Sequence, residues 1–115
     1  MLVPGAAQRV IIHVNEDTSS AHDFLFNEIL EFLYTQGVAG ATMIRPAAGF
    51  GSHHRLHTAG AGSVEGEHMP VRIEFVESSE AVAAILPSLC ELVTDGLVET
   101  QATTIVKSAQ RAQPV

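Results

Sequence analysis

The stretch MPVRIEFVE, residues 69–77, decides the fold because apolar and polar side chains alternate along it. Val71, Ile73 and Phe75 occupy every second position, with charged residues between them. Successive side chains of a β-strand point to opposite faces of the sheet, so this pattern predicts a strand with one buried and one polar face. The rest of the chain must supply the layer that covers the apolar side.

Residues 17–37, DTSSAHDFLFNEILEFLYTQG, predict a first helix upstream of this strand. The apolar side chains recur at the three- and four-residue spacing that places them on one helix face. Ser19 or Ser20 is the predicted N-cap, because a hydroxyl oxygen can accept hydrogen bonds from the free N–H groups of the first turn. Gly37 suits the left-handed position that follows the last turn.

Residues 78–96, SSEAVAAILPSLCELVTDG, predict a second capped helix directly after the strand. Gly96 is expected to end it. Pro87 falls inside the apolar pattern, and proline lacks the N–H that a helix interior needs. We therefore expect a kink or a brief break at this position.

Three further segments read as strands: QRVIIHVNE (8–16), in which β-branched residues dominate, GATMIRP (40–46), which Pro46 ends, and LVETQATTIVK (97–107). The resulting order βαββαβ is that of the split βαβ motif. It predicts an α+β ferredoxin-like fold, in which one four-stranded antiparallel sheet carries two helices on one face.

The other face of this sheet would then lack cover. Ile11, Met43 and Val76 are expected to point toward it, because they alternate with the positions assigned to the helix side. A homo-oligomer that buries this face is the simplest way to remove these apolar side chains from water.

The bulk composition fits a single domain over residues 1–115, with a core at about 8–107 and a polar tail, 108–115, that we expect to be disordered. The chain has 115 residues, of which 46% are hydrophobic and 17% charged. Cys90 is the one cysteine, and no secretory signal or membrane-spanning run is evident, so we expect a cytoplasmic protein. The net charge of −7 argues against binding nucleic acid.

The connection of residues 46–69 is far longer than the roughly 2–5 residues of an ordinary hairpin loop. Its first half contains GFG, and Gly49 and Gly51 would allow backbone N–H groups to approach an anion. Arg45 and Arg55 could add charge-assisted bonds to a phosphate. The alternative is a plain connection, since a Gly-x-Gly beside arginine is a common pattern.

The same connection contains the pattern HHxxH, formed by His53, His54 and His57. Imidazole nitrogens are ligands for zinc, copper and nickel, so a metal site is the alternative to solvent-exposed histidines. The small residues of 59–67, AGAGSVEGE, predict a mobile segment.

Enzymatic activity has little support in the sequence. No catalytic triad, phosphate-binding Walker loop or zinc-protease motif is present, and Glu74 and Glu77 have no nucleophile placed with them. We expect His13, on the outward side of its strand, to be satisfied by a neighbouring side chain. The chain is therefore predicted not to be an enzyme.

Three segments, GVAGATMIRPAAGFGSHHRLHT (37–58), MPVRIEFVE (69–77) and ILPSLCELVTDGLVE (85–99), resemble the PII-like family known as domain-of-unknown-function 190. The resemblance implies a PII-like homotrimer that binds an adenine nucleotide (AMP, ADP or ATP) in the clefts between subunits. It also implies a signalling or regulatory role, in which the 46–69 loop acts on a protein partner such as a membrane transporter.

By position, the resemblance also implies which residues bind the nucleotide. These are Arg45, Gly49, Phe50, Gly51, Arg55, His57, Asp95 and Gly96. The alternative function is a metal-binding protein that uses the loop histidines, and a small enzyme is the least supported class.

Overall fold

The structure is a computed structural model that describes residues 2–20, 23–51, 57–58 and 69–111. It confirms the predicted α+β architecture and adds a short hairpin within the long connection. In chain order the elements are β1 (Gly5–Asn15), α1 (Leu25–Thr35), β2 (Ala41–Ile44), β3 (Ala48–Gly49), β4 (His57–Thr58), β5 (Pro70–Glu77), α2 (Ser79–Leu92) and β6 (Leu97–Ile105).

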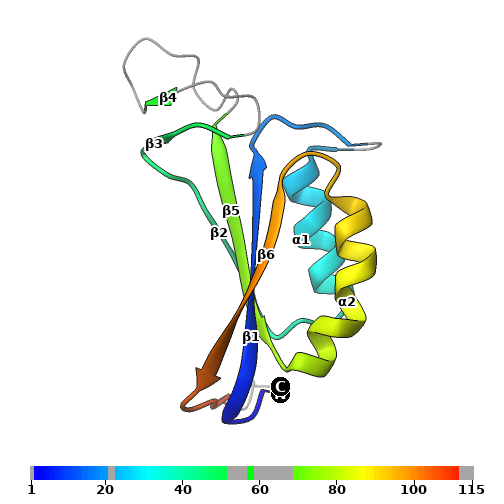
Figure 1. Cartoon of the computed structure of the whole chain (residues 1–115), viewed down its shortest axis with the longest axis vertical. Helices are drawn as coiled ribbons and strands as arrows, with labels where there is room; N and C mark the ends of the chain where they lie inside the picture. Colours follow the sequence, from blue (N-terminus) through cyan, green and yellow to red (C-terminus); the bar gives the residue numbers. More distant parts are fainter. Residues whose placement is uncertain (1, 21–22, 52–56, 59–68, 112–115) are drawn as a thin grey trace.

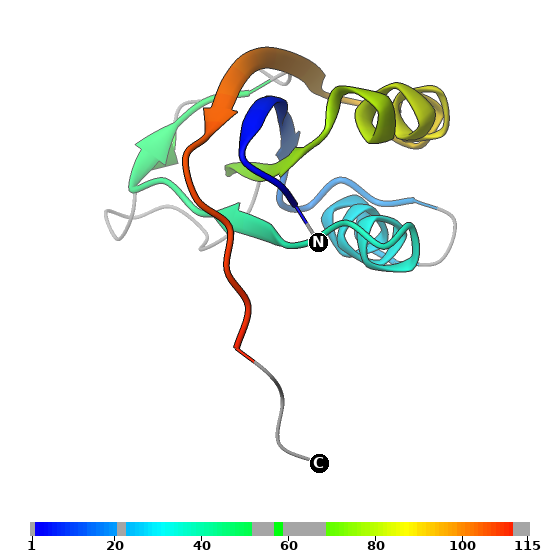
Figure 2. The same cartoon turned by 90° about the horizontal axis from the view of Figure 1, so that it is seen from below.

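The four long strands form one antiparallel sheet in the order β2-β5-β1-β6. β1 is one of the two inner strands, and it pairs with the other, β5, from Gln8↔Glu77 to Asn15↔Pro70. On its other side it pairs with β6 from Gly5↔Ile105 to His13↔Leu97. Both helices pack against one face of this sheet (Figures 1 and 2), as the strand order of a ferredoxin-like fold requires.

The core lies between the sheet and the two helices. It is built from alternate positions of β1 and β5, which face apolar stripes of α1 and α2. Burying a side chain of this size stabilises the fold by about 1.5–3 kcal/mol relative to leaving it exposed. The fully buried apolar residues include Val10, Ile12, Leu25, Ile29, Ile73 and Leu89.

The first helix begins at Leu25, so the predicted N-caps Ser19 and Ser20 are wrong. The preceding residues form a turn, in which the N–H of Leu25 donates to the carbonyl of Thr18 at 2.8 Å. Because of this turn, the helix begins after the predicted caps. The carboxylate of Asp23 accepts from the N–H of Phe24 at 2.6 Å. At the other end, Gly37 has the expected left-handed backbone, with φ 78°.

The second helix is capped as predicted, because the hydroxyl of Ser78 accepts from the N–H of Ala81 at 3.2 Å. It runs through Pro87 without the brief break that was one of the two expectations. It ends at Leu92, before Gly96, which lies in the turn into β6. None of the helices in the described ranges is long and apolar enough to span a membrane.

The predicted outward position of Met43 is wrong. Met43 pairs with Ile73, a core residue, and packs against the helix-side core. Ile11 and Val76 do alternate with core residues of their strands, so they lie on the open face. Met43 and Ile44 are both apolar, so the sequence does not show which of them faces the helices. The pairing of β2 with β5 decides which side chain faces inward.

Candidate functional site

Two adjacent cavities lie at the end of the sheet where β1 ends and β5 begins. The first cavity, of about 320 Å³, is lined by His13, Val14, Asn15, Phe50, Gly51, Pro70, Gly96 and Leu97. The second cavity, of about 330 Å³, is lined by His13, Ile44, Pro46, Ala48, Phe50, Pro70, Val71 and Arg72. His13, Phe50 and Pro70 line both, so the two cavities are neighbours along one rim of the sheet.

Both glycines of the first cavity lie close to the end of β1, and Gly96 lies against its backbone. A Cβ atom on Gly51 would collide with the side-chain oxygen of Asn15. A Cβ atom on Gly96 would collide with the backbone oxygen of His13, and its φ of 153° is a conformation that side chains disfavour. The GFG segment and the turn before β6 therefore approach the end of β1 from two sides.

Three predicted site residues, Phe50, Gly51 and Gly96, are brought together around the first cavity. They come from parts of the sequence that are 45 residues apart, since 96 − 51 = 45. Phe50 lines the cavity while remaining 55% exposed as a residue. Asp95 lies beside Gly96 in the same turn.

Asn15 and His13 line the first cavity, but the sequence did not point to either as a site residue. Asn15 is the one polar residue among the buried ones in the described ranges, at 2% exposure. Burying an amide side chain is costly without hydrogen bonds, so a polar residue at the end of an apolar strand was the available signal.

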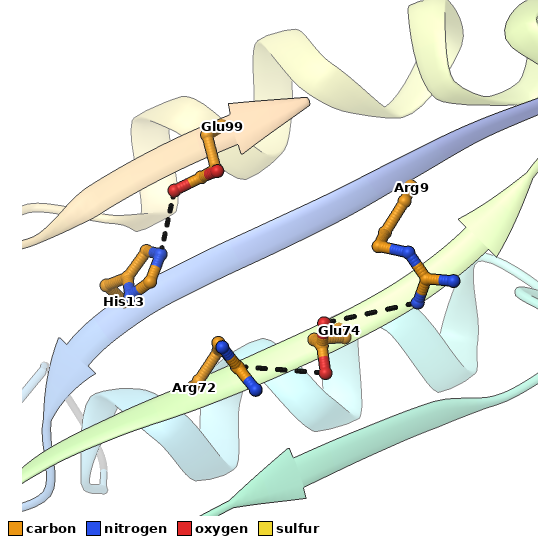
Figure 3. Close-up of polar contacts among 5 residues, drawn as sticks. All are labelled: Arg9, His13, Arg72, Glu74 and Glu99. Carbon is orange, nitrogen blue, oxygen red and sulfur yellow. Dashed lines mark hydrogen bonds and ion pairs between the residues drawn. The ribbon is translucent and has the colours of Figure 1, made fainter. Parts of the chain in front are cut away.

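The open face of the sheet carries a set of polar contacts among charged residues and His13 (Figure 3). His13 Nε2 and Glu99 Oε2 lie 2.9 Å apart, which confirms that a neighbour satisfies the histidine. Glu74 lies 3.7 Å from Arg72 and 4.0 Å from Arg9, measured between the charged atoms. This face therefore combines charged side chains with the apolar Ile11.

Arg45 lines neither cavity, because its guanidinium is engaged elsewhere. Its Nε donates to Glu16 Oε1 at 2.6 Å, and a second guanidinium nitrogen lies 2.5 Å from the same oxygen. The Arg45 side chain is 58% exposed and that of Glu16 only 18%. The adjacent residues Ile44 and Pro46 both line the second cavity, so the backbone of Arg45 lies beside that cavity.

The remaining predicted residues lie in the hairpin of β3 and β4 or outside the described residues. Gly49 pairs with His57 across this hairpin. Arg55, His53 and His54 fall outside the described residues, as does the predicted mobile segment 59–67. Within the part of the chain that the structure describes, no three potential ligands lie together in a way that could hold a metal ion.

Comparison with known sequences identifies the family. The sequence profile of the DUF190 family, described as "Uncharacterized ACR, COG1993", matches residues 7–105. The chain belongs to the DUF190 family. The matched range spans β1 to β6 and so includes every residue that lines the two cavities.

Solved structures with the same fold are PII-like proteins. This DUF190 protein superposes on the PII-like protein TTHA0516 from Thermus thermophilus with a TM-score of 0.65 and 21% identity, covering 92% of this chain and 94% of that one. Its similarity to CPII, a nitrogen regulatory PII-like protein from Thiomonas intermedia, has a TM-score of 0.66 and 16% identity, covering 93% and 94%. That CPII structure contains ADP, AMP and bicarbonate. These similarities establish the PII-like fold of the DUF190 protein.

Proposed function

We propose that this protein is a PII-like regulatory protein that binds an adenine nucleotide at the first cavity. The observation that carries the proposal is the convergence of the GFG segment, Asn15 and the Gly96 turn on one cavity. The binding of ADP and AMP by CPII, which has the same fold, supports the choice of ligand.

The geometry suits a nucleotide in three respects. The volume of about 320 Å³ lies at the lower end of the roughly 300–1,000 Å³ typical of small-molecule sites. Phe50, which lines the cavity and is half exposed, is an aromatic residue of the kind on which a base can stack. Glycine at positions 51 and 96 lets both loops pack against the end of β1, so that their backbones form part of the cavity wall. Of the other predicted residues, we keep Arg45, Gly49, Arg55, His57 and Asp95 as proposed contributors.

We further propose that the site is completed between the subunits of a cytoplasmic homotrimer. The open sheet face holds Leu97, the cross-strand partner of His13, at 55% exposure, beside the polar contacts of Figure 3. A second copy of the chain that packs there would also stand beside His13, which belongs to both this face and the first cavity. The function would be regulation of a protein partner through the long connection, without catalysis.

Calorimetric titration tests the proposal. We expect AMP, ADP, ATP or cyclic AMP to bind the purified protein with a micromolar dissociation constant, and GDP to serve as the matched control for base selectivity. Gel filtration of the same samples reports the oligomeric state. If no adenine nucleotide binds below about millimolar concentration, which corresponds to about −4.1 kcal/mol, the nucleotide proposal is wrong.

A further inference from the structure

Glu16 occupies a position that connects both flanks of the long connection. Its carboxylate holds the guanidinium of Arg45, just before β3. Its backbone N–H donates to the carbonyl of Met69 at 2.7 Å, just before β5. Glu16 also directly follows Asn15, which lines the first cavity.

The two partners of this ion pair differ in how firmly the protein holds their side chains. Glu16 is fixed, because its backbone extends the β1–β5 ladder by one hydrogen bond beyond Asn15↔Pro70 and its side chain is largely buried. Arg45 is largely exposed and lies beyond the end of β2. If the pair separates, the long arginine side chain is therefore the one that moves.

We propose that Glu16 is an internal competitor that holds Arg45 away from the phosphate of the bound nucleotide. This inference rests on the proposed function. A phosphate group offers three acceptor oxygens and a charge of about −1.5 to −2, whereas Glu16 offers one carboxylate, so a phosphate at the cavity can draw the guanidinium across. Arg45 then exchanges one anion for another, and the affinity for the nucleotide is reduced by the free energy of the Arg45–Glu16 pair.

The exchange predicts that a substitution beside the binding site increases the affinity for the nucleotide, whereas such substitutions usually decrease it. Glu16→Gln removes the competing charge and should tighten ADP binding by roughly two- to fivefold, the range expected for releasing a partly exposed ion pair. Arg45→Ala should weaken ADP binding by roughly tenfold or more, because a charge-assisted contact is lost. In the Arg45→Ala background, Glu16→Gln should have no further effect.

The matched control is Glu31→Gln, which removes the same charge from an exposed position of α1. It corrects for the general effect of net charge on an anionic ligand. An affinity of Glu16→Gln that is equal to or weaker than that of Glu31→Gln would overturn the inference. If Glu16→Gln fails to fold, Glu16→Asp, which retracts the carboxylate, should shift the affinity in the same direction.

A nuclear magnetic resonance measurement separates this inference from the proposed function. The Nε–H signal of Arg45 should differ between the unmodified protein and Glu16→Gln, and saturation with ADP should displace it from its ion-paired position. If ADP does not bind at all, the proposed function fails, and inorganic pyrophosphate becomes the probe of the exchange. An Arg45 signal that neither ADP nor pyrophosphate moves overturns the exchange itself.

Discussion

Gly96 shows how a single hydrogen atom in place of a side chain shapes the candidate site. Gly96→Ala would place a Cβ atom against the backbone oxygen of His13 and within 3.0 Å of Val14 Cγ1. We expect the free energy of unfolding to fall by about 1–3 kcal/mol, because the φ of 153° is also unfavourable for alanine. Urea denaturation measures the loss.

Gly40→Ala is the control for this substitution, because a Cβ atom at Gly40 has no neighbour within 4 Å. Its free energy of unfolding should stay within about 0.5 kcal/mol of that of the unmodified protein. Equal effects of the two substitutions would contradict the close contact between Gly96 and β1.

Phe50 should matter more for binding than for stability. The residue is more than half exposed, yet it lines both cavities. Removing an aromatic ring that stacks on a base costs about 1–3 kcal/mol, so Phe50→Ala should weaken ADP binding roughly 5- to 150-fold. Calorimetry gives the affinity, and Phe50→Tyr should retain it. A Phe50→Ala protein that binds ADP normally would remove Phe50 from the site.

Local sequence signals identified only part of this site. GFG was found because glycine allows backbones to approach closely, whereas Gly96 was proposed as a site residue only through the family resemblance. The Arg45–Glu16 pair was not found, since it joins residues 29 positions apart and depends on where β1 and β2 end in space. Long-range contacts of this kind leave no local pattern in a single sequence.

At the scale of elements, the two helices differ in how their N-termini are capped. The hydroxyl of Ser78 caps α2, so Ser78→Ala should lower the free energy of unfolding by about 0.5–2 kcal/mol. Ser79→Ala, one residue later, removes a hydroxyl that is not the cap and serves as the matched control. Thermal unfolding followed by circular dichroism measures both, and a larger loss for Ser79→Ala would reassign the cap.

The strand and helix order was predictable because the apolar periods are long and regular. The beginning of α1 was not, because Asp17, Ser19, Ser20 and Asp23 all offer side chains suited to a cap. The choice among them depends on the hydrogen bond from the N–H of Leu25 to the carbonyl of Thr18, which joins residues seven positions apart. The face of Met43 was equally ambiguous for a strand of four residues.

At the scale of the whole molecule, the two faces of the sheet should respond differently to a new charge. Ile11 lies on the open face with Glu74 and Glu99 as its cross-strand neighbours. If that face is buried in a homotrimer, Ile11→Glu should dissociate it, because an unpaired buried charge is strongly unfavourable. Met43→Glu should instead disrupt folding, because Met43 packs against the core.

Light scattering after gel filtration measures the mass, and circular dichroism measures the fold. Ala83→Glu, at an exposed position of α2, is the control and should change neither. A monomeric mass for the unmodified protein at micromolar concentration would contradict the trimer. A trimeric Ile11→Glu protein would place the interface elsewhere.

The central position of β1 has a consequence for how the protein is made. As the chain leaves the ribosome, β1 emerges before the other elements, yet its two neighbours in the sheet are among the last of them to follow. Gly5 can pair with Ile105 only after β6 has been synthesised. The strand β1 is therefore without its neighbours β5 and β6 during most of synthesis. Closing such long loops is slow, and an unpaired apolar strand is a target for aggregation and for chaperones. Folding should therefore be completed only once β6 has left the ribosome, in a single late step.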